Sequence, residues 1–283
     1  MKDTYLLDNF SINCKGNLID LSKPKIMGII NVTPDSFYDG GKIKSDKELL
    51  IKVEEFLVQG ADFIDIGGYS SRPGAKEVSE NQEINRVLPN LKLILNEFPS
   101  SLISIDTFRS KVADEALHMG ASIINDISAW EIDPKLFNVI VKHKCPYILM
   151  HMQGTPSTMQ VNPNYKNVTQ EVIKFLSEKL FELQKNGIHD VIIDPGFGFG
   201  KSLDHNFKLM SELDQLRVLE QPILVGISRK SMIYKTLKIK SLNSINGTTA
   251  LNMIALTKGC KILRVHDIKE AKECIKIYQQ LKM

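Results

Sequence analysis

The chain has 283 residues, of which 43% are hydrophobic and 24% are charged, and its formal net charge is +3. This length and apolar content allow one large domain or two ordinary ones, and an α/β barrel of roughly 250 residues fits as a single domain. The mild positive charge suits anionic small molecules, whereas nucleic-acid binding needs a more concentrated basic surface. No apolar run approaches the ~18 residues of a membrane span. We therefore expect neither nucleic acid nor a membrane as a partner.

Cysteine and histidine spacing bears on redox compartment and metal binding. The chain has four irregularly spaced cysteines and no C-x-x-C pair: Cys14, Cys145, Cys260 and Cys274. This pattern argues against a disulfide framework and a zinc knuckle. The histidines at positions 118, 143, 189 and 205 show no paired spacing of the kind that a zinc site needs, and His151 is interpreted as structural. The N-terminus lacks the apolar core of a signal peptide, so we expect a reduced, cytoplasmic protein.

Short apolar runs rich in Ile and Val recur along the whole chain and predict eight β-strands. They span residues 25–33, 63–68, 102–107, 122–128, 147–152, 191–196, 223–228 and 261–267. A further strand-like region precedes them, and residues 5–20 could form a hairpin across the floor of a barrel.

Helical spacing fills the segments between these strands. An apolar stripe over residues 49–57 ends at Gly60, which suits a helix C-cap. Ser79 and Gln82 have the form of a capping box, and the helix that they open contains Pro89, which should kink it. Further stripes cover residues 172–183, before Gly187, and residues 271–278.

Eight strands alternating with helices predict a single closed (β/α)8 barrel, the TIM-barrel architecture. We place an N-terminal extension at residues 1–24 and the barrel at residues 25–283. A doubly wound sheet is the alternative, but it would carry its glycine-rich turn after the first strand, whereas that turn follows the sixth strand here.

Polar residues stand at the ends of most predicted strands, which is where this barrel class builds active sites. They are Asn31, Asp106, Asn125 with Asp126, Asp194, Ser228 to Lys230, Arg264 and His266. Taken alone, Asp126 could cap a helix and Asn125 could satisfy a loop amide. Strand alternation places Arg264 and His266 on one face, and also Ser228 and Lys230 if their strand continues that far.

These residues predict a site with two parts. Acceptors and donors suited to the edge of a planar heterocycle come from Asp106, Asn125, Asp194 and Lys230. Arg264 and His266 offer cationic donors before the last helix, which is where such barrels commonly hold phosphate.

The segment "DPGFGFGK", residues 194–201, follows the sixth strand. It matches neither a P-loop, because position 195 is proline, nor a dinucleotide fingerprint. We interpret its alternate glycines as allowing the backbone to approach a ligand closely. The loops "NVTPDSFYDGGK" and "GGYSSRPGA" are either ordinary surface turns or lids that close over substrate.

Eight motifs occur in an order that resembles the dihydropteroate synthase family of folate biosynthesis. They are "MGIINVTPDSF", "GGYSSRPGA", "SIDTF", "INDIS", "HMQGTP", "DPGFGFGK", "GISRKSM" and "RVHD", and the similarity spans roughly residues 25–268. That family implies a transferase that joins 6-hydroxymethyl-7,8-dihydropterin diphosphate to 4-aminobenzoate and releases diphosphate. It also implies Mg2+ and a homodimer formed through the last helices.

The resemblance assigns roles residue by residue. Pterin contacts fall to Asp106, Asn125, Asp194 and Lys230; diphosphate contacts to Asn31, Arg264 and His266; and aminobenzoate contacts to Ser71, Arg72, Pro73, Phe199 and Ser228. Asn31 would also help to hold Mg2+, and the residues implied in catalysis are Asp35, Asp106 and Lys230.

Tyr69 and Ser71 depart from the family pattern, because glutamate and threonine are frequent there. The binding strength of the aromatic acid and of sulfonamide mimics is therefore left open. Two rivals are a corrinoid-linked pterin-binding methyltransferase with a related barrel, which lacks the paired "SSRPGA" and "SRKSM" loops, and a noncatalytic pterin or folate carrier. A carrier would have no use for Mg2+ or for a diphosphate site.

Overall fold

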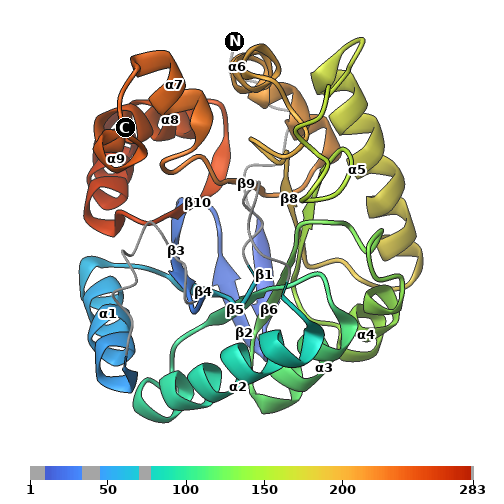
Figure 1. Ribbon diagram of the computed structural model, residues 1–283, viewed down its shortest axis with the longest axis vertical. Coiled ribbons are helices and arrows are strands. Elements are labelled where there is room, and N and C mark those ends of the chain that lie inside the picture. The colour runs from blue at the N-terminus through green and yellow to red at the C-terminus, as the bar shows by residue number, and fades with distance from the viewer. Residues whose placement is uncertain (1–9, 34–44, 70–77, 282–283) are drawn as a thin grey trace.

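The computed structural model describes residues 10–33, 45–69 and 78–281, and within them eight parallel strands close into a barrel (Figure 1). Hydrogen bonding joins the strands in the order β10-β3-β4-β5-β6-β7-β8-β9. Their bounds are β3 (Lys25–Asn31), β4 (Phe63–Gly67), β5 (Ile103–Asp106), β6 (Ile123–Asp126), β7 (Tyr147–Met150), β8 (Val191–Asp194), β9 (Ile223–Val225) and β10 (Cys260–Val265). Each of the eight predicted strands is present, and the predicted barrel is confirmed.

The helices surround the barrel (Figure 1). They are α1 (Asp46–Gln59), α2 (Glu80–Glu97), α3 (Ser110–Met119), α4 (Lys135–His143), α5 (Val168–Lys185), α6 (Leu203–Ser211), α7 (Ser231–Leu237), α8 (Ile245–Thr257) and α9 (Ile268–Leu281), with 3-10 turns η1 (Leu213–Leu219) and η2 (Ser241–Asn243). Gly60 caps α1 in the left-handed conformation, and Ser79 with Gln82 forms the predicted capping box. Helix α2 continues through Pro89. None of the helices in the described ranges combines the length and apolarity that a bilayer crossing demands.

The barrel has one apolar layer inside and another beneath the helices, because strand side chains alternate between the two faces. Inward residues such as Met27, Phe63 and Ile192 form the inner layer, whereas Ile64 and Ile105 pack outward with the helices. Every one of these five side chains is fully buried.

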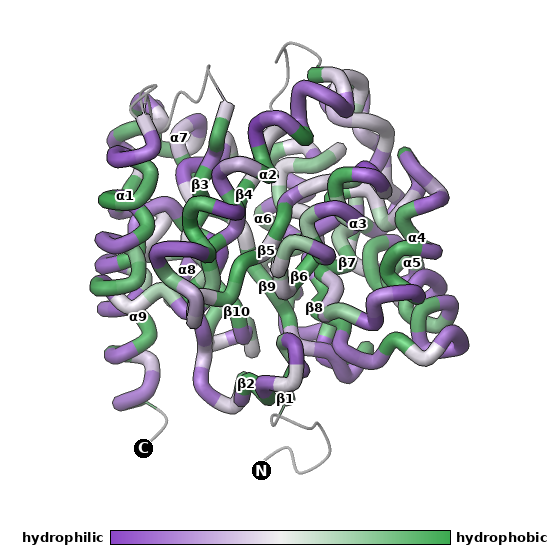
Figure 2. The backbone as a smooth tube through the Cα atoms, turned by 90° about the horizontal axis from the view of Figure 1, so that it is seen from below, coloured by the Kyte–Doolittle hydropathy of each residue, from purple (hydrophilic) through white to green (hydrophobic). Residues whose placement is uncertain are grey.

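An antiparallel hairpin closes the N-terminal end of the barrel, as the sequence predicts. Its strands are β1 (Ser11–Cys14) and β2 (Asn17–Asp20), which lie beneath the barrel strands in Figure 2. Ile12 and Leu21 are buried against the inner layer. Burying each of these side chains contributes about 1.5–3 kcal/mol. Because the hairpin fills this end of the barrel, only the C-terminal end of the strands can hold an active site.

The ladder at that opposite end sets polar residues beside one another. Asn31 pairs with Gly67, Gly67 with Asp106, and Asp106 with Asn125, each on the next strand along. Because parallel strands all point the same way, their carboxyl ends meet at one rim. The fold therefore delivers the strand-end residues to a common mouth.

Candidate active site

Arg264 of β10 is the centre of the polar network in the barrel mouth. Its Nε lies 2.7 Å from Asp65 Oδ2, and its Nη2 lies 2.6 Å from both Asp65 Oδ2 and Asp106 Oδ2. Asn125 Nδ2 donates to the same Asp65 oxygen at 3.1 Å. The guanidinium thus crosses the mouth toward β4 and β5, and its charge is already shared by two carboxylates.

Asp65 is the residue of this network that sequence reasoning missed. It lies mid-strand in β4 rather than at a strand end, and its side chain is fully buried. The available signal was alternation, because Phe63 packs inward and residue 65 shares its face. Asp65 Oδ1 and the hydroxyl of its ladder neighbour Ser104 have no hydrogen-bond partner among the described residues.

Burial shifts the ionisation of the groups around the mouth. It raises the pKa of Asp106 to about 7 despite the attraction of Arg264, and it raises the pKa of Asp194. Burial lowers the pKa of Lys230 to about 8, against the pull of Asp194. Burial alone would also lower the pKa of Arg264, but Asp65 and Asp106 raise it. Such shifted groups gathered in one place are typical of an active site.

Asp194 and Lys230 meet at the glycine-rich loop after β8. Asp194 Oδ1 accepts a hydrogen bond from Gly196 N at 2.7 Å, which fixes the carboxylate at the start of the loop. Lys230 Nζ donates to the carbonyl of Phe197 and lies 4.7 Å from the centroid of the Phe199 ring. Two residues that the sequence assigned to the pterin therefore contact the same loop.

Two of the three glycines of this loop have a packing role that the sequence interpretation did not include. Gly196, Gly198 and Gly200 have φ of 70°, 82° and 62°, a region that L side chains rarely adopt. A Cβ on Gly196 would lie 1.9 Å from His151 O, and one on Gly200 would lie 2.4 Å from Gln153 O. Close approach to the chain after β7, and not only to a ligand, demands glycine here.

Gly196→Ala should therefore destabilise the protein more than Gly187→Ala. Gly187 has φ of 77°, and a Cβ added to it would meet no atom of the described residues within 4 Å, so it isolates the conformational cost of about 1–2 kcal/mol. Gly196→Ala adds overpacking of about 1–3 kcal/mol. Urea unfolding of both variants checks this, and equal losses would contradict the packing argument.

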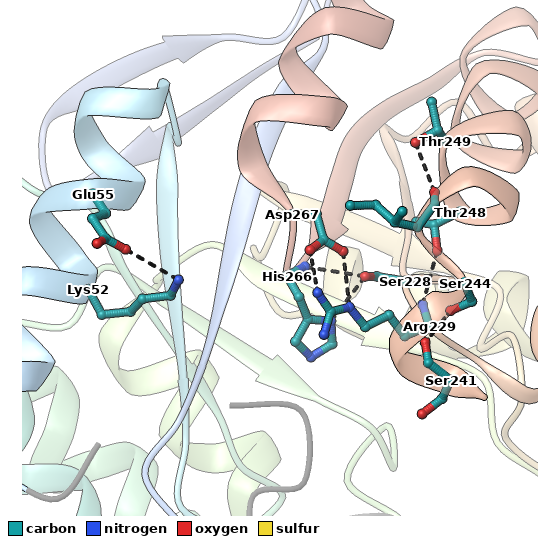
Figure 3. Close-up of polar contacts among 11 residues, drawn as sticks. Lys52, Glu55, Ser228, Arg229, Ser241, Ser244, Thr248, Thr249, His266 and Asp267 are labelled. Carbon is teal, nitrogen blue, oxygen red and sulfur yellow. Dashed lines mark hydrogen bonds and ion pairs between the residues drawn. The ribbon is translucent and has the colours of Figure 1, made fainter. Parts of the chain in front are cut away.

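Ser228 and His266 lie side by side near the start of α9 (Figure 3). His266 Nδ1 is 3.0 Å from Ser228 Oγ, and the His266 amide donates to the same oxygen at 3.3 Å. Next to them, Arg229 Nε donates to Asp267 Oδ2 at 3.1 Å. Ser228 therefore contacts His266, a residue that the sequence assigned to the diphosphate.

Strand β9 ends at Val225, so Ser228 and Lys230 are not related by strand alternation. Arg229 between them has φ of 58°, and Lys230 stands at the N-cap of α7. The chain turns sharply after the strand, and this turn rather than a continued strand directs Lys230 to the glycine loop.

Asn31 lies at the end of β3, across Gly67 from Asp106. A Cβ on Gly67 would lie 3.6 Å from Asn31 Oδ1 and 3.7 Å from Asp106 Oδ2. The absence of a side chain on Gly67 leaves these oxygens facing the same space.

An apolar cluster borders the polar groups. Phe199 and Tyr69 pack against five buried residues: Phe108, Ile127, Met150, Met152 and Met159. This surface suits the face of an aromatic ligand. Four predicted site residues lie outside the described residues: Asp35, Ser71, Arg72 and Pro73.

Asp126 is accounted for by local structure. Its Oδ1 accepts from Ser128 N at 2.8 Å, and its Oδ2 accepts from Trp130 N at 2.6 Å and Tyr147 Oη at 2.7 Å. It thus stabilises the turn after β6, while its neighbour Asn125 faces Asp65.

Packing of α3 against α4 brings together two histidines whose spacing along the chain shows no pairing. His118, His143 and Asp114 offer ligand atoms within 4.8 Å of one another. Asp114 Oδ1 already accepts from His143 Nε2 at 2.6 Å and from Lys142 Nζ at 2.9 Å. The Lys142 ammonium therefore already balances the negative charge of the Asp114 carboxylate.

Known proteins share the sequence of this chain over most of its length. The family described as pterin binding enzyme matches residues 27–266. Dihydropteroate synthase of Haemophilus influenzae is 45% identical over 263 residues, covering 92% of this chain and 95% of its own. The chain belongs to the dihydropteroate synthase family.

Solved structures of this family superpose closely. Yersinia pestis dihydropteroate synthase, in a sulfonamide drug complex, has a TM-score of 0.92 and 40% identity, covering 96% of this chain and 99% of its own. The Xanthomonas albilineans enzyme in complex with 7,8-dihydropteroate has a TM-score of 0.85 and 33% identity, covering 96% of this chain and 99% of its own.

Proposed function

We propose that this enzyme condenses 6-hydroxymethyl-7,8-dihydropterin diphosphate with 4-aminobenzoate to give 7,8-dihydropteroate and diphosphate. The observation that carries the proposal is the gathering of Asp106, Asn125, Asp194 and Lys230 at one mouth beside an apolar wall. The relative solved with 7,8-dihydropteroate supports the same product.

Pterin recognition falls to the buried polar groups. Asp194 accepts hydrogen bonds from ring N–H groups. Lys230 keeps one hydrogen bond to the Phe197 carbonyl and donates its other protons to the ring carbonyl and N5. Asp106 and Asn125 contact the remaining polar atoms along the edge of the pterin ring. Hydrogen bonds to charged partners in a desolvated pocket are about twice as strong as neutral ones, which favours this ring over apolar analogues.

Diphosphate departure needs positive charge and oxygen ligands at the rim. His266 and Arg264 lower the energy of the developing charge, and Asn31 contributes an amide oxygen. The amide oxygen of Asn31 is a hard donor of the kind that Mg2+ takes beside substrate phosphates, so this residue fits the ion. When bound, Mg2+ neutralises phosphate charge and assists the leaving group.

Carbon–oxygen cleavage leaves a methylene cation that the electron-rich pterin stabilises. Asp106 and Asp35 add negative potential there. The neutral aniline nitrogen attacks the methylene carbon, and the proton that it then loses passes to the released diphosphate or to solvent. The protein therefore supplies no nucleophile. Phe199 forms the apolar wall for the aromatic acid, with Ser71, Arg72, Pro73 and Ser228 assigned to the same substrate. Positioning and exclusion of water do the remaining work.

Titration calorimetry with the pterin diphosphate, with and without Mg2+, separates this function from its rivals. We expect binding that Mg2+ strengthens and that Asp194→Asn weakens at least tenfold. Tight binding of reduced folate without any effect of Mg2+ would favour a methyltransferase or a carrier instead.

A plot of kcat/KM against pH should be bell-shaped. Below pH about 7, Asp106 takes up a proton and stops acting as a charged acceptor, whereas above pH about 8, Lys230 loses the proton that it donates. We therefore expect kcat/KM to fall on both sides of a maximum between these values. Lys230→Arg should move the alkaline limb upward; an unmoved limb would mean that another group sets it.

A homodimer and a cytoplasmic location complete the proposal. Helix α8 has no charged residue, and Ile254 on it and Leu242 just before it are 41% and 57% exposed. The four free, buried cysteines fit a reducing compartment. Sedimentation at micromolar concentration should give twice 31.9 kDa, and Ile254→Lys should give monomers. A wild-type monomer would remove the dimer from the proposal.

A further inference from the structure

Lys201 is buried behind the glycine loop rather than directed at a ligand. The residue is only 2% exposed. Its Nζ donates to Gly196 O at 2.9 Å, Phe199 O at 3.1 Å and His151 Nδ1 at 2.9 Å. These acceptors are all uncharged atoms, and burial lowers the pKa of Lys201 to about 7. A buried ammonium with such partners is costly, which points to a specific use.

The loop of residues 196–200 has no regular secondary structure, yet each of its five carbonyls accepts a side-chain hydrogen bond. Lys230 donates to Phe197 O, Gln160 to Gly198 O at 2.7 Å, and Tyr165 to Gly200 O at 2.8 Å. Lys201 donates to the other two, Gly196 O and Phe199 O. The backbone turn itself is closed by the Phe199 amide, which donates to Gly196 O at 3.1 Å. Lys201 Nζ therefore bridges the carbonyls at the two ends of this turn.

His151 connects this turn to the neighbouring strand β7. Burial and the charge of Lys201 lower the pKa of His151 to about 2, so its ring is neutral and Nδ1 can accept. The ring packs edge-on against Phe175, with centroids 5.0 Å apart. Lys201 thus ties the loop to His151, which follows β7.

The other side of the loop faces the candidate active site. There, Phe197 O receives Lys230 Nζ, and the Phe199 ring lies under the same ammonium. A shift of this turn moves the wall assigned to the aminobenzoate and the lysine assigned to the pterin together. Displacements of about 1 Å by residues away from the chemistry can cost about 10²-fold in rate.

We propose that Lys201 is a positioning residue, whose ammonium holds residues 196–200 in the shape that sets Phe199 and Lys230 for the two substrates. This inference rests on the proposed function. It assigns Lys201 no contact with either substrate.

Steady-state kinetics of Lys201→Met and Lys201→Gln test this role. We expect Lys201→Met to raise KM for 4-aminobenzoate and to lower kcat/KM by about 10–100-fold, and Lys201→Gln, which keeps one donor, to lose less. The matched control is Lys208→Met, which removes an exposed lysine of α6 that pairs with Glu212 and should change neither constant. Unchanged constants in Lys201→Met would overturn the proposal.

A double-mutant cycle separates positioning from a general loss of stability. If Lys201 acts through Phe199, then Lys201→Met combined with Phe199→Ala should lose much less than the product of the two single effects. Independent, multiplicative losses would mean that Lys201 does not act through this ring, and the proposal would fail.

Hydrogen exchange tests the loop without reference to catalysis. In the wild-type protein, the Phe199 amide should exchange at least tenfold more slowly than in an unstructured peptide. Exchange at the peptide rate would overturn the inference even if neither Lys201 variant folds. A wild-type protein with a protected amide but no condensation activity would instead contradict the proposed function.

Discussion

Replacing Lys230 with methionine should lower kcat/KM for the pterin diphosphate by about 10³-fold or more, which corresponds to about 4 kcal/mol of transition-state stabilisation. The ammonium approaches Phe197 O and is poised beside Asp194, so it is the group assigned to donate to the pterin. Methionine keeps an unbranched side chain of similar length but removes every donor. Steady-state kinetics with purified enzyme measure the loss.

Lys235→Met is the matched control for that variant. Lys235 lies on the same helix, α7, and is exposed, so its removal should leave kcat/KM within about twofold. Urea unfolding should show both variants folded, because Lys230 contributes a ligand contact rather than core volume. Near-normal turnover of Lys230→Met would overturn the assignment of the site.

Arg264→Met should cost about 3–5 kcal/mol of unfolding free energy at pH 7. The guanidinium is the cation between Asp65, which is fully buried, and Asp106, whose side chain is 21% exposed. Without it, two carboxylates share a buried site with no countercharge. Either the two negative charges repel each other, or one carboxylate takes up a proton. Urea unfolding followed by circular dichroism measures the change.

Adding Asp65→Asn to Arg264→Met should restore part of the lost stability, because it removes one of the two stranded charges. The two effects are then non-additive, as expected for residues in contact. A stability loss below about 1 kcal/mol for Arg264→Met would be that of an exposed ion pair and would contradict the network at the mouth.

The barrel and its rim could be predicted because their signals are local in sequence. A run such as residues 191–194 is apolar up to its last residue, as a strand buried on both faces must be, and a charged group at its end has only the rim to occupy. Asp106, Asn125 and Asp194 were found in this way.

Residues whose roles depend on long-range contacts could not be predicted. Asp65 interrupts an apolar strand, and its significance depends on Arg264, 199 residues away. Lys201 ends a glycine motif that places it beside the site, yet its ammonium turns back to His151. Tertiary packing sets the partners of both charged groups, and the periodicity of the sequence carries no information about such contacts.

The central claim is that this mouth couples departure of diphosphate to attack by an aromatic amine. The measurement that tests it most directly is release of inorganic diphosphate from purified enzyme with the pterin diphosphate and Mg2+, with and without 4-aminobenzoate. We predict release that requires the aminobenzoate, saturates with it and yields 7,8-dihydropteroate in equal amount. Release at the same rate without the aminobenzoate, or no release with both substrates present, would contradict the account.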